Sequence, residues 1–183
     1  MRDGKRMDVI GLLGPLRRYA RSLTRDESQA EDLVQDALVR AYERRGTFRP
    51  DGNLRGWLLS ILHNTFIDDR RRHAAEARRT QHLAEQIEAS APADQEARVR
   101  LQQVQQAFLG LPDEQRAALH LVAIEGLSYQ EAAATLDIPI GTLMSRLGRA
   151  RAALRAFEAG HELPGAVSGK FRPNLRIVGG SRE

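Results

Sequence analysis

Two groups of arginines have the composition expected of a protein that contacts a polyanion. From Gly141 to Phe157 there are four arginines and no acidic residue, and from Phe66 to Arg79 there are five arginines against Asp68, Asp69 and Glu76. A guanidinium group forms charge-assisted hydrogen bonds with phosphate oxygens. Two separate basic segments therefore predict contact with a nucleic acid at two places.

The basic group from Gly141 to Phe157 has a pattern that suits the reading of base edges. Apolar residues recur at helical spacing at Ile140, Leu143, Leu147, Ala150 and Leu154. Ser145, Arg146 and Arg149 fall between them, so a helix that buries the apolar stripe would expose these three side chains. Arginine can bond O6 and N7 of guanine, and serine suits phosphate or base edges. The alternatives are a solvated basic face and a membrane-surface helix, the latter weakened because the stripe has no aromatic residue before Phe157.

No pattern of catalytic or metal-binding residues stands out. The chain has no cysteine, which excludes disulfides, thiolate zinc sites and cysteine nucleophiles. The five histidines show no ligand spacing, and nothing resembles a nucleophile elbow, a phosphate loop or a carboxylate metal site. The sequence therefore predicts a protein that is not an enzyme, with no catalytic residue, no metal site and no cofactor.

Composition favours an all-α fold in an aqueous compartment. The 183 residues are rich in Ala, Leu, Arg, Glu and Gln, and only 5% are aromatic, which favours helices. The charged start from Met1 to Asp8 does not resemble a signal segment, and no apolar run approaches the ~20 residues that span a bilayer. We expect a cytoplasmic protein without membrane insertion.

In the first half, helical periodicity predicts three helices. The first covers about Val9 to Leu23, the second runs to about Arg45, and the third covers about Leu54 to Arg72. Two pairs near the start of the second helix have capping-box spacing, Thr24 with Glu27 and Ser28 with Glu31. The turn-forming residues between Thr47 and Asn53 predict a loop before the third helix.

In the second half, the pattern predicts a helix-turn-helix. Pro112 opens one helix, and Ser128 with Glu131 forms a capping-box pair that opens a short one. A turn at 137–141 then leads into the arginine-bearing helix. The segment 88–96 is rich in Ala, Pro and acidic residues and indicates a linker.

The predicted architecture is therefore all-α, with two small helical domains joined by a flexible linker and a helix-turn-helix in the second. The boundaries are a first domain at 1–79, a linker at 80–96, a second domain at 97–157 and a Gly/Pro-containing C-terminal tail at 158–183.

Two motif blocks in this order resemble the extracytoplasmic-function (ECF) group of sigma factors in the sigma-70 family. The first half contains "AEDLVQDALVRAYE" and "WLLSILHNTFIDDRRR", and the second contains "LPDEQRAALHLVAIEGLSYQEAAATLDIPIGTLMSRLGRARAAL". The resemblance covers roughly residues 9 to 157. It implies a promoter-recognition subunit of bacterial RNA polymerase, whose partners are the polymerase core enzyme, −35 duplex, −10 single strand and an anti-sigma protein. Such a protein is cytoplasmic, associates with the nucleoid when active, and can be held at the membrane by its anti-sigma protein.

The resemblance also implies a role for individual residues. The residues assigned to the core-polymerase contact are Asp32, Gln35, Asp36 and Arg40. Those assigned to the −10 element are Asp51, Gly52, Asn53, Asn64, Arg70, Arg71 and Arg72. Those assigned to the −35 element are Thr142, Ser145, Arg146, Arg149 and Arg151. Taken alone, each set also fits a simpler structural reading, such as a solvated charged face, a plain turn or stabilisation of a helix C-terminus.

Three residues qualify the resemblance. Trp57 shares helical spacing with Ile61 and is expected in the core rather than on a base-stacking surface. Met144 stands where many family members have Lys or Arg, and Gly148 stands where they have a bulky residue, so the preferred −35 sequence does not follow from the family. A glycine inside a helix costs about 1 kcal/mol relative to alanine, which a close approach of DNA or another helix would offset.

Two other functions fit parts of the pattern. A stand-alone helix-turn-helix transcription regulator would account for the second domain but leave the first unexplained. A helical protein-interaction module would use its basic faces to bind an acidic protein.

Overall fold

The computed structural model describes residues 9–49, 51–77 and 96–158, and every regular element in these ranges is helical. In chain order they are a 3₁₀ turn Ile10–Leu12, α1 Leu13–Thr24, α2 Glu27–Glu43, a 3₁₀ turn Arg45–Thr47, α3 Leu54–Ala77, α4 Glu96–Gly110, α5 Asp113–Leu119, a π-helical turn His120–Ile124, α6 Tyr129–Thr135 and α7 Ile140–Glu158. The all-α prediction is confirmed for these residues. Most of the expected linker and nearly all of the expected tail lie outside them.

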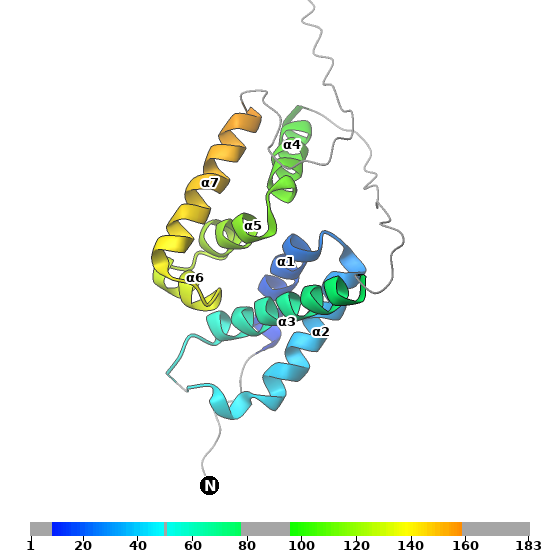
Figure 1. Cartoon of the computed structure of the whole chain (residues 1–183), viewed down its shortest axis with the longest axis vertical. Helices are drawn as coiled ribbons and strands as arrows, with labels where there is room; N and C mark the ends of the chain where they lie inside the picture. Colours follow the sequence, from blue (N-terminus) through cyan, green and yellow to red (C-terminus); the bar gives the residue numbers. More distant parts are fainter. Residues whose placement is uncertain (1–8, 50, 78–95, 159–183) are drawn as a thin grey trace, which may run out of the picture.

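The helices form two bundles that pack against each other (Figure 1). The first bundle consists of α1, α2 and α3, and the second of α4 to α7. Helix α5 contacts α1, and α6 contacts α3. One hydrophobic core runs through both bundles, from Leu16 and Leu62 in the first to Leu121 and Leu147 in the second. The two predicted domains are therefore joined by side-chain packing as well as by the chain.

The start of α2 differs from the prediction. Asp26 is the N-cap residue, and its carboxylate accepts a hydrogen bond from the Gln29 amide at 2.7 Å. The hydroxyl of Thr24 instead donates to the Ala20 and Asp26 carbonyls. Arg25 ends α1 in the left-handed conformation, so Thr24 still belongs to the preceding helix. Both predicted capping boxes at this site are wrong, because aspartate is an equally good N-cap residue and Asp26 with Gln29 has the same spacing.

The predicted helix-turn-helix is confirmed as α6 and α7. The Ser128 hydroxyl accepts a hydrogen bond from the Glu131 amide, and the Glu131 carboxylate accepts one from the Ser128 amide, which completes the expected capping box. Leu143 and Leu147 are buried as predicted, and α7 packs on both α5 and α6. Ile140 was expected in this stripe but is 45% exposed.

A single buried guanidinium group links the two bundles. Arg116 on α5 is fully buried and uses all of its N–H donors. It donates to the Ser22 and Leu23 carbonyls in the last turn of α1, at 3.2 Å for Leu23. It also donates to the Leu109 carbonyl in the last turn of α4, to the Leu111 carbonyl just after α4 and to Asp113, at 3.2, 2.5 and 2.6 Å. One cation thus satisfies the unpaired carbonyls at the C-terminal ends of two helices from different bundles.

A second buried polar group lies beside it. The Glu125 carboxylate, fully buried, accepts hydrogen bonds from Arg18 on α1 and Arg55 on α3, and its Oε1 lies 3.3 Å from His120 Nε2. Tyr19 of α1 has its hydroxyl 3.0 Å from His63 Nδ1, and its ring lies 5.1 Å from the His120 ring. We call these residues together with Arg116 the inter-bundle joint.

Burial sets the charge state of the joint. It lowers the pKa of His63 and of His120 from 6.5 to about 4, in each case mainly because an imidazolium would lose its hydration, and for His63 also because Arg146 is near. Burial together with Arg25 and Arg70 lowers the pKa of Arg116 to about 10, so this group stays charged at neutral pH. The joint therefore holds neutral histidines beside a permanent cation and a carboxylate.

Acidification is expected to destabilise the fold through these histidines. The pKa of each histidine is lower in the folded chain than in the unfolded chain. Between pH 6.5 and 4 the unfolded chain therefore binds protons that the folded chain does not. The free energy of unfolding is highest above pH 6.5 and falls as the pH drops from 6.5 toward 4. Urea unfolding should show a falling midpoint between pH 6.5 and 5, above the range where ordinary carboxylates titrate. The variant His63→Gln should flatten this slope. A wild-type midpoint that is constant from pH 7 to 5 would contradict the assignment.

Candidate functional site

The outer face of α2 forms one side of an open groove. Asp32, Gln35 and Asp36 are exposed, while the apolar stripe of the same helix is buried against α1 and α3. Asp32 and Asp36 line a hollow of about 570 Å³ together with Asp69 and Arg70 of α3. Arg40 differs, because its guanidinium pairs with Asp68 at 3.1 Å. The structure therefore brings three of the four residues assigned to the polymerase contact onto one free polar surface and holds Arg40 against α3.

The loop before α3 is built around Asn53. Its Oδ1 accepts a hydrogen bond from the Gly56 amide at 3.0 Å, which caps the start of α3. Its Nδ2 donates to Glu131 of α6 at 2.8 Å, across the gap between the bundles. Asp51 and Gly52 are exposed, and a Cβ on Gly52 would meet the Arg49 carbonyl at 3.0 Å, so the turn requires a small residue there.

Trp57 and Asn64 of α3 differ in exposure. Trp57 is half-buried, and its ring lies 5.3 Å from that of Phe48, so it belongs to the edge of the core as expected. Asn64 is exposed and lines a hollow of about 360 Å³ between the bundles. Of the two, Asn64 has the more accessible side chain.

The three arginines near the end of α3 have separate surroundings. Arg70 pairs with Asp113 of the second bundle, and Arg72 pairs with Asp69 one turn back on α3. Arg71 is exposed and lines the same inter-bundle hollow as Asn64. The basic run therefore does not form one continuous phosphate-binding face in this arrangement.

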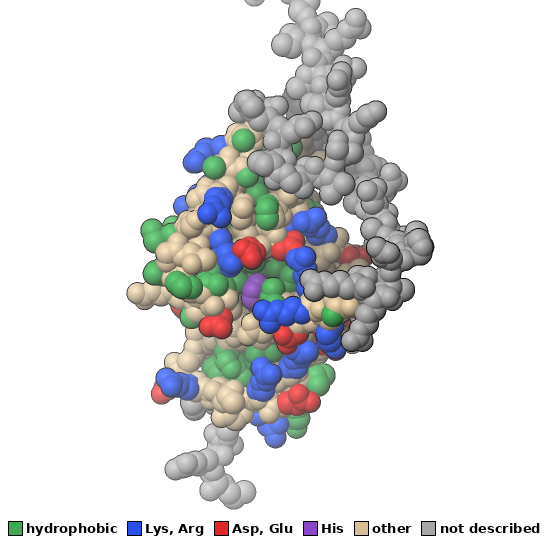
Figure 2. Space-filling model, in the orientation of Figure 1, with side chains coloured by type: hydrophobic (Ala, Val, Ile, Leu, Met, Phe, Trp, Pro, Cys, Tyr) green, Lys and Arg blue, Asp and Glu red, His purple; other side chains and the backbone are tan. Residues whose placement is uncertain are grey.

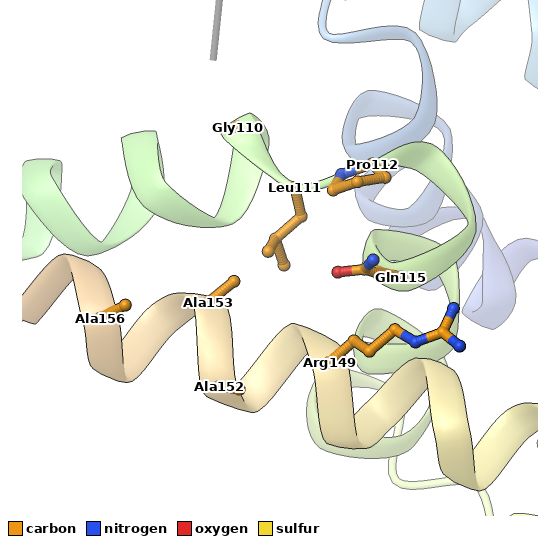
Figure 3. A pocket seen from close by; sticks show the side chains of 8 residues that line it. All are labelled: Gly110, Leu111, Pro112, Gln115, Arg149, Ala152, Ala153 and Ala156. Atoms are coloured by element: carbon orange, nitrogen blue, oxygen red, sulfur yellow. The ribbon is translucent and has the colours of Figure 1, made fainter. Parts of the chain in front are cut away.

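The N-terminal half of α7 presents the residues expected to read DNA. Thr142, Ser145 and Arg149 are exposed. Figure 3 shows the Arg149 side chain reaching from α7 toward α5, beside Gln115, at the edge of a mostly apolar hollow of about 430 Å³. Arg151 lies 3.4 Å from the Tyr129 hydroxyl of α6 and is otherwise exposed.

Arg146 is the exception on this helix. Its side chain is only 19% exposed and pairs with Glu114 of α5 at 2.8 Å. It faces the first bundle and lines the hollow that Asn64 and Arg71 also line. A residue assigned to −35 DNA and two assigned to the −10 strand thus share one hollow.

Met144 and Gly148 both lie on the exposed side of α7. Met144 is 55% exposed, and a Cβ on Gly148 would meet nothing within 4 Å. No helix among the described residues approaches Gly148, so packing of a neighbouring helix does not explain it. The open backbone there leaves room for a closely approaching external partner.

The contacts that connect the bundles were not predicted from the sequence. Glu125 contacts partners that lie 107 and 70 positions away in the chain, and Glu131 contacts Asn53 across 78 positions. No local pattern marks such pairs. Figure 2 shows acidic side chains next to basic ones over the middle of one face, where the two bundles meet.

The described residues contain no group of three or more His, Asp or Glu side chains placed to hold a metal ion. Within the same ranges, no helix has the length and apolar character needed to cross a membrane.

Two family matches cover the two bundles. Residues 11–76 match sigma-70 region 2, and residues 101–154 match sigma-70 region 4. The chain is 37% identical over 154 residues to the ECF RNA polymerase sigma factor EcfG of Rhodopseudomonas palustris, which covers 84% of each chain. It is 39% identical over 141 residues to the ECF RNA polymerase sigma factor SigM of Mycobacterium tuberculosis, covering 76% of this chain and 69% of that one.

Solved structures agree with the sequence matches. The sigma factor RpoE of Bartonella quintana, determined in complex with the anti-sigma factor NepR, superimposes with a TM-score of 0.72 at 34% identity and covers 82% of this chain and 94% of that one. CnrH, determined in complex with the cytosolic domain of CnrY, gives a TM-score of 0.60 at 31% identity, covering 84% and 86%. The chain belongs to the sigma-70 family, as a member of its extracytoplasmic-function group of RNA polymerase sigma factors.

Proposed function

We propose that this protein binds core RNA polymerase and directs it to promoters with −35 and −10 elements, without catalysing a reaction itself. The observation that carries the proposal is the presence, on one chain, of a groove beside the exposed Asp32 and Asp36 of α2 and of exposed Thr142, Ser145 and Arg149 on α7. A stand-alone regulator would need only the second surface, and the region 2 match accounts for the first bundle.

In this function, Asp32, Gln35 and Asp36 orient the chain on a basic surface of the polymerase. Their exposure and the hollow beside them support this role. Arg40 is assigned to the same contact. Because it pairs with Asp68, its role is indirect: it holds α3 in position against α2.

The −10 strand is assigned to the loop and α3. Asp51, Gly52 and Asn53 supply short polar groups to an unstacked base, and Asn64 supplies another at the helix surface. Arg70, Arg71 and Arg72 contact phosphates. The −35 duplex is assigned to Thr142, Ser145, Arg146, Arg149 and Arg151, with Arg149 as the base-reading residue because it is exposed on the N-terminal half of α7.

Regulation by an anti-sigma protein is part of the proposal. The support is that two similar structures contain such partners, NepR with RpoE and the cytosolic domain of CnrY with CnrH. The protein would act in the cytoplasm at the nucleoid, and a membrane-bound inhibitor would hold it at the membrane surface.

Run-off transcription tests the whole proposal. Purified core polymerase with a library of genomic promoter fragments should give promoter-specific transcripts only when this chain is added. Few aromatic side chains in the first domain imply limited melting power, so transcripts should come from well-matched promoters. If the chain does not bind core polymerase, the proposal is refuted.

Charge reversal at Asp32 and Asp36 should weaken binding to core polymerase through the assigned face and not through a change in the fold. The double variant Asp32→Arg/Asp36→Arg should weaken core binding by about tenfold or more, because like charges placed opposite each other across an interface cost several kcal/mol. Fluorescence anisotropy with labelled protein measures this affinity. Glu43→Arg on the exposed end of α2 is the matched control and should bind as wild type. Equal weakening by the control would refute the assigned face.

Loss of Arg149 should reduce −35 recognition. Arg149→Ala is expected to weaken binding to the −35 duplex by about 1–3 kcal/mol and to relax preference at one base pair. Arg155→Ala, near the C-terminal end of the same helix, should weaken binding with little change in base preference. Competition between duplexes that differ at single positions measures both effects. An Arg149→Ala variant with unaltered affinity and preference removes Arg149 from the site.

A further inference from the structure

The exposed face of α7 has a small apolar patch among its polar residues. Met144 is 55% exposed and Ile140 is 45% exposed. Gly141 precedes Met144 by about one turn and Gly148 follows it by about one turn, and a Cβ added at either glycine would meet nothing within 4 Å in the described part of the chain. We call Ile140, Gly141, Met144 and Gly148 the apolar patch of α7. None of the residues assigned to DNA belongs to it.

Met144 is the most prominent side chain of the patch. On a helix, residues three and four positions apart are surface neighbours, and those of Met144 are Ile140, Gly141, Leu147 and Gly148. None of the four has a polar side chain, and the two glycines leave the methionine side chain standing above bare backbone. A thioether donates no hydrogen bond and carries no charge. A favourable partner for Met144 therefore offers an apolar group at a place where the α7 backbone can come close.

The surroundings of the patch indicate which kind of partner carries that group. From Gly141 to Phe157 the helix has four arginines and no acidic residue, and Arg149 and Arg151 are exposed shortly after Met144. The main apolar stripe of α7 is buried against α5 and α6, so little apolar surface remains exposed on this helix. A stable protein interface buries on the order of 1,000 Å² or more, far beyond one methionine and one isoleucine. A small apolar patch bordered by cations fits a polyanion that carries few apolar groups.

Duplex DNA offers such a group. In the major groove, the 5-methyl group of thymine is the apolar group that the base edges present. We infer that Met144 is a specificity-determining residue, whose side chain packs against a thymine methyl group in the −35 duplex. This inference rests on the proposed function, because it needs the N-terminal half of α7 to lie in the major groove. It adds to the assigned residues a contact that is made by apolar burial and not by hydrogen bonds.

The two glycines give this contact its room. A side chain at Gly148 would stand between the α7 backbone and the base pairs, whereas a bare backbone permits close approach. The unbranched methionine side chain has three rotatable bonds and adapts to the position of a methyl group. Met144 and Gly148, the two residues by which α7 departs from the family pattern, thus have one explanation.

Deoxyuridine tests the contact, because uracil differs from thymine only by the missing methyl group. The probe is a promoter fragment that the chain transcribes, with the thymines of its −35 element replaced by deoxyuridine, first together and then one at a time. Competition against the unmodified fragment measures binding by the full chain assembled on core polymerase. Replacement of one thymine should weaken binding by about fourfold, the factor that corresponds to one buried methyl group.

Variants of Met144 assign this effect to its side chain. Met144→Gln keeps nearly the same length but is polar, and it should bind the thymine and deoxyuridine fragments equally. Met144→Leu remains apolar and should keep most of the preference for thymine. The matched control is Leu101→Ala, which removes an apolar side chain that is 67% exposed on α4 and should show the wild-type preference.

Salt dependence gives a second readout. Met144→Lys replaces the apolar group by a cation that can reach a phosphate. The preference for thymine should disappear, and the logarithm of the affinity should fall more steeply with the logarithm of the salt concentration, with a slope larger by about 1. An unchanged slope would show that position 144 does not face the duplex.

Equal binding of the thymine and deoxyuridine fragments by the wild-type chain, or a preference that survives in Met144→Gln, overturns the inference. A Met144→Gln variant that keeps the preference and loses affinity for core polymerase assigns the patch to a protein contact instead. In each of these cases, promoter-specific transcripts from the wild-type chain retain the proposed function. A chain that supports no transcripts loses the function, and the inference with it.

Discussion

The arrangement of the two bundles depends on the burial of one cation. Arg116 lies where the last turn of α1 meets the turn between α4 and α5, and both helix ends carry carbonyls that their own helices leave unpaired. A neutral side chain at this position would leave several carbonyls buried without donors, each at a cost of about 1–3 kcal/mol. The planar guanidinium with its fixed set of donors satisfies them together, whereas the point charge of a lysine would not. The position of α5, and with it of α6 and α7, follows from this contact.

Packing at the joint leaves some polar side chains exposed and engages others between the bundles. The groove beside Asp32 and Asp36 lies between α2 and α3 and is open to solvent. Asn53, Arg70 and Arg146, in contrast, are engaged between the bundles. A partner that binds the α2 groove meets exposed side chains, whereas a partner that binds Asn53, Arg70 or Arg146 has to displace contacts within the chain.

What the sequence predicted depended on the range of the interaction. The capping box of Ser128 and Glu131 and the buried stripe of Leu143 and Leu147 are local, within one or two turns, and were confirmed. The start of α2 was wrong because Asp26 competes with two serine and threonine patterns that look equally good. The free face of α2 followed from periodicity, but the burial of Arg146 did not, because its partner Glu114 and the first bundle approach from elsewhere in the chain. The assigned contacts with polymerase and DNA stay predictions, since they concern surfaces whose partners are absent from the sequence.

The π-helical turn at His120–Ile124 brings two buried polar side chains to the same side of the chain. Its wider hydrogen bonding, with the Glu125 amide bonded to the His120 carbonyl at 3.0 Å, places His120 and Glu125 side by side toward the first bundle. A regular α-helix over the same residues would turn them to different sides. Deleting one residue here would restore α-helical geometry with little change in the direction of the chain that follows, because a π-helical turn holds about one residue more than an α-helical turn. The extra residue therefore serves the contact between His120 and Glu125, and its loss would separate these two side chains while leaving the neighbouring helices nearly in place.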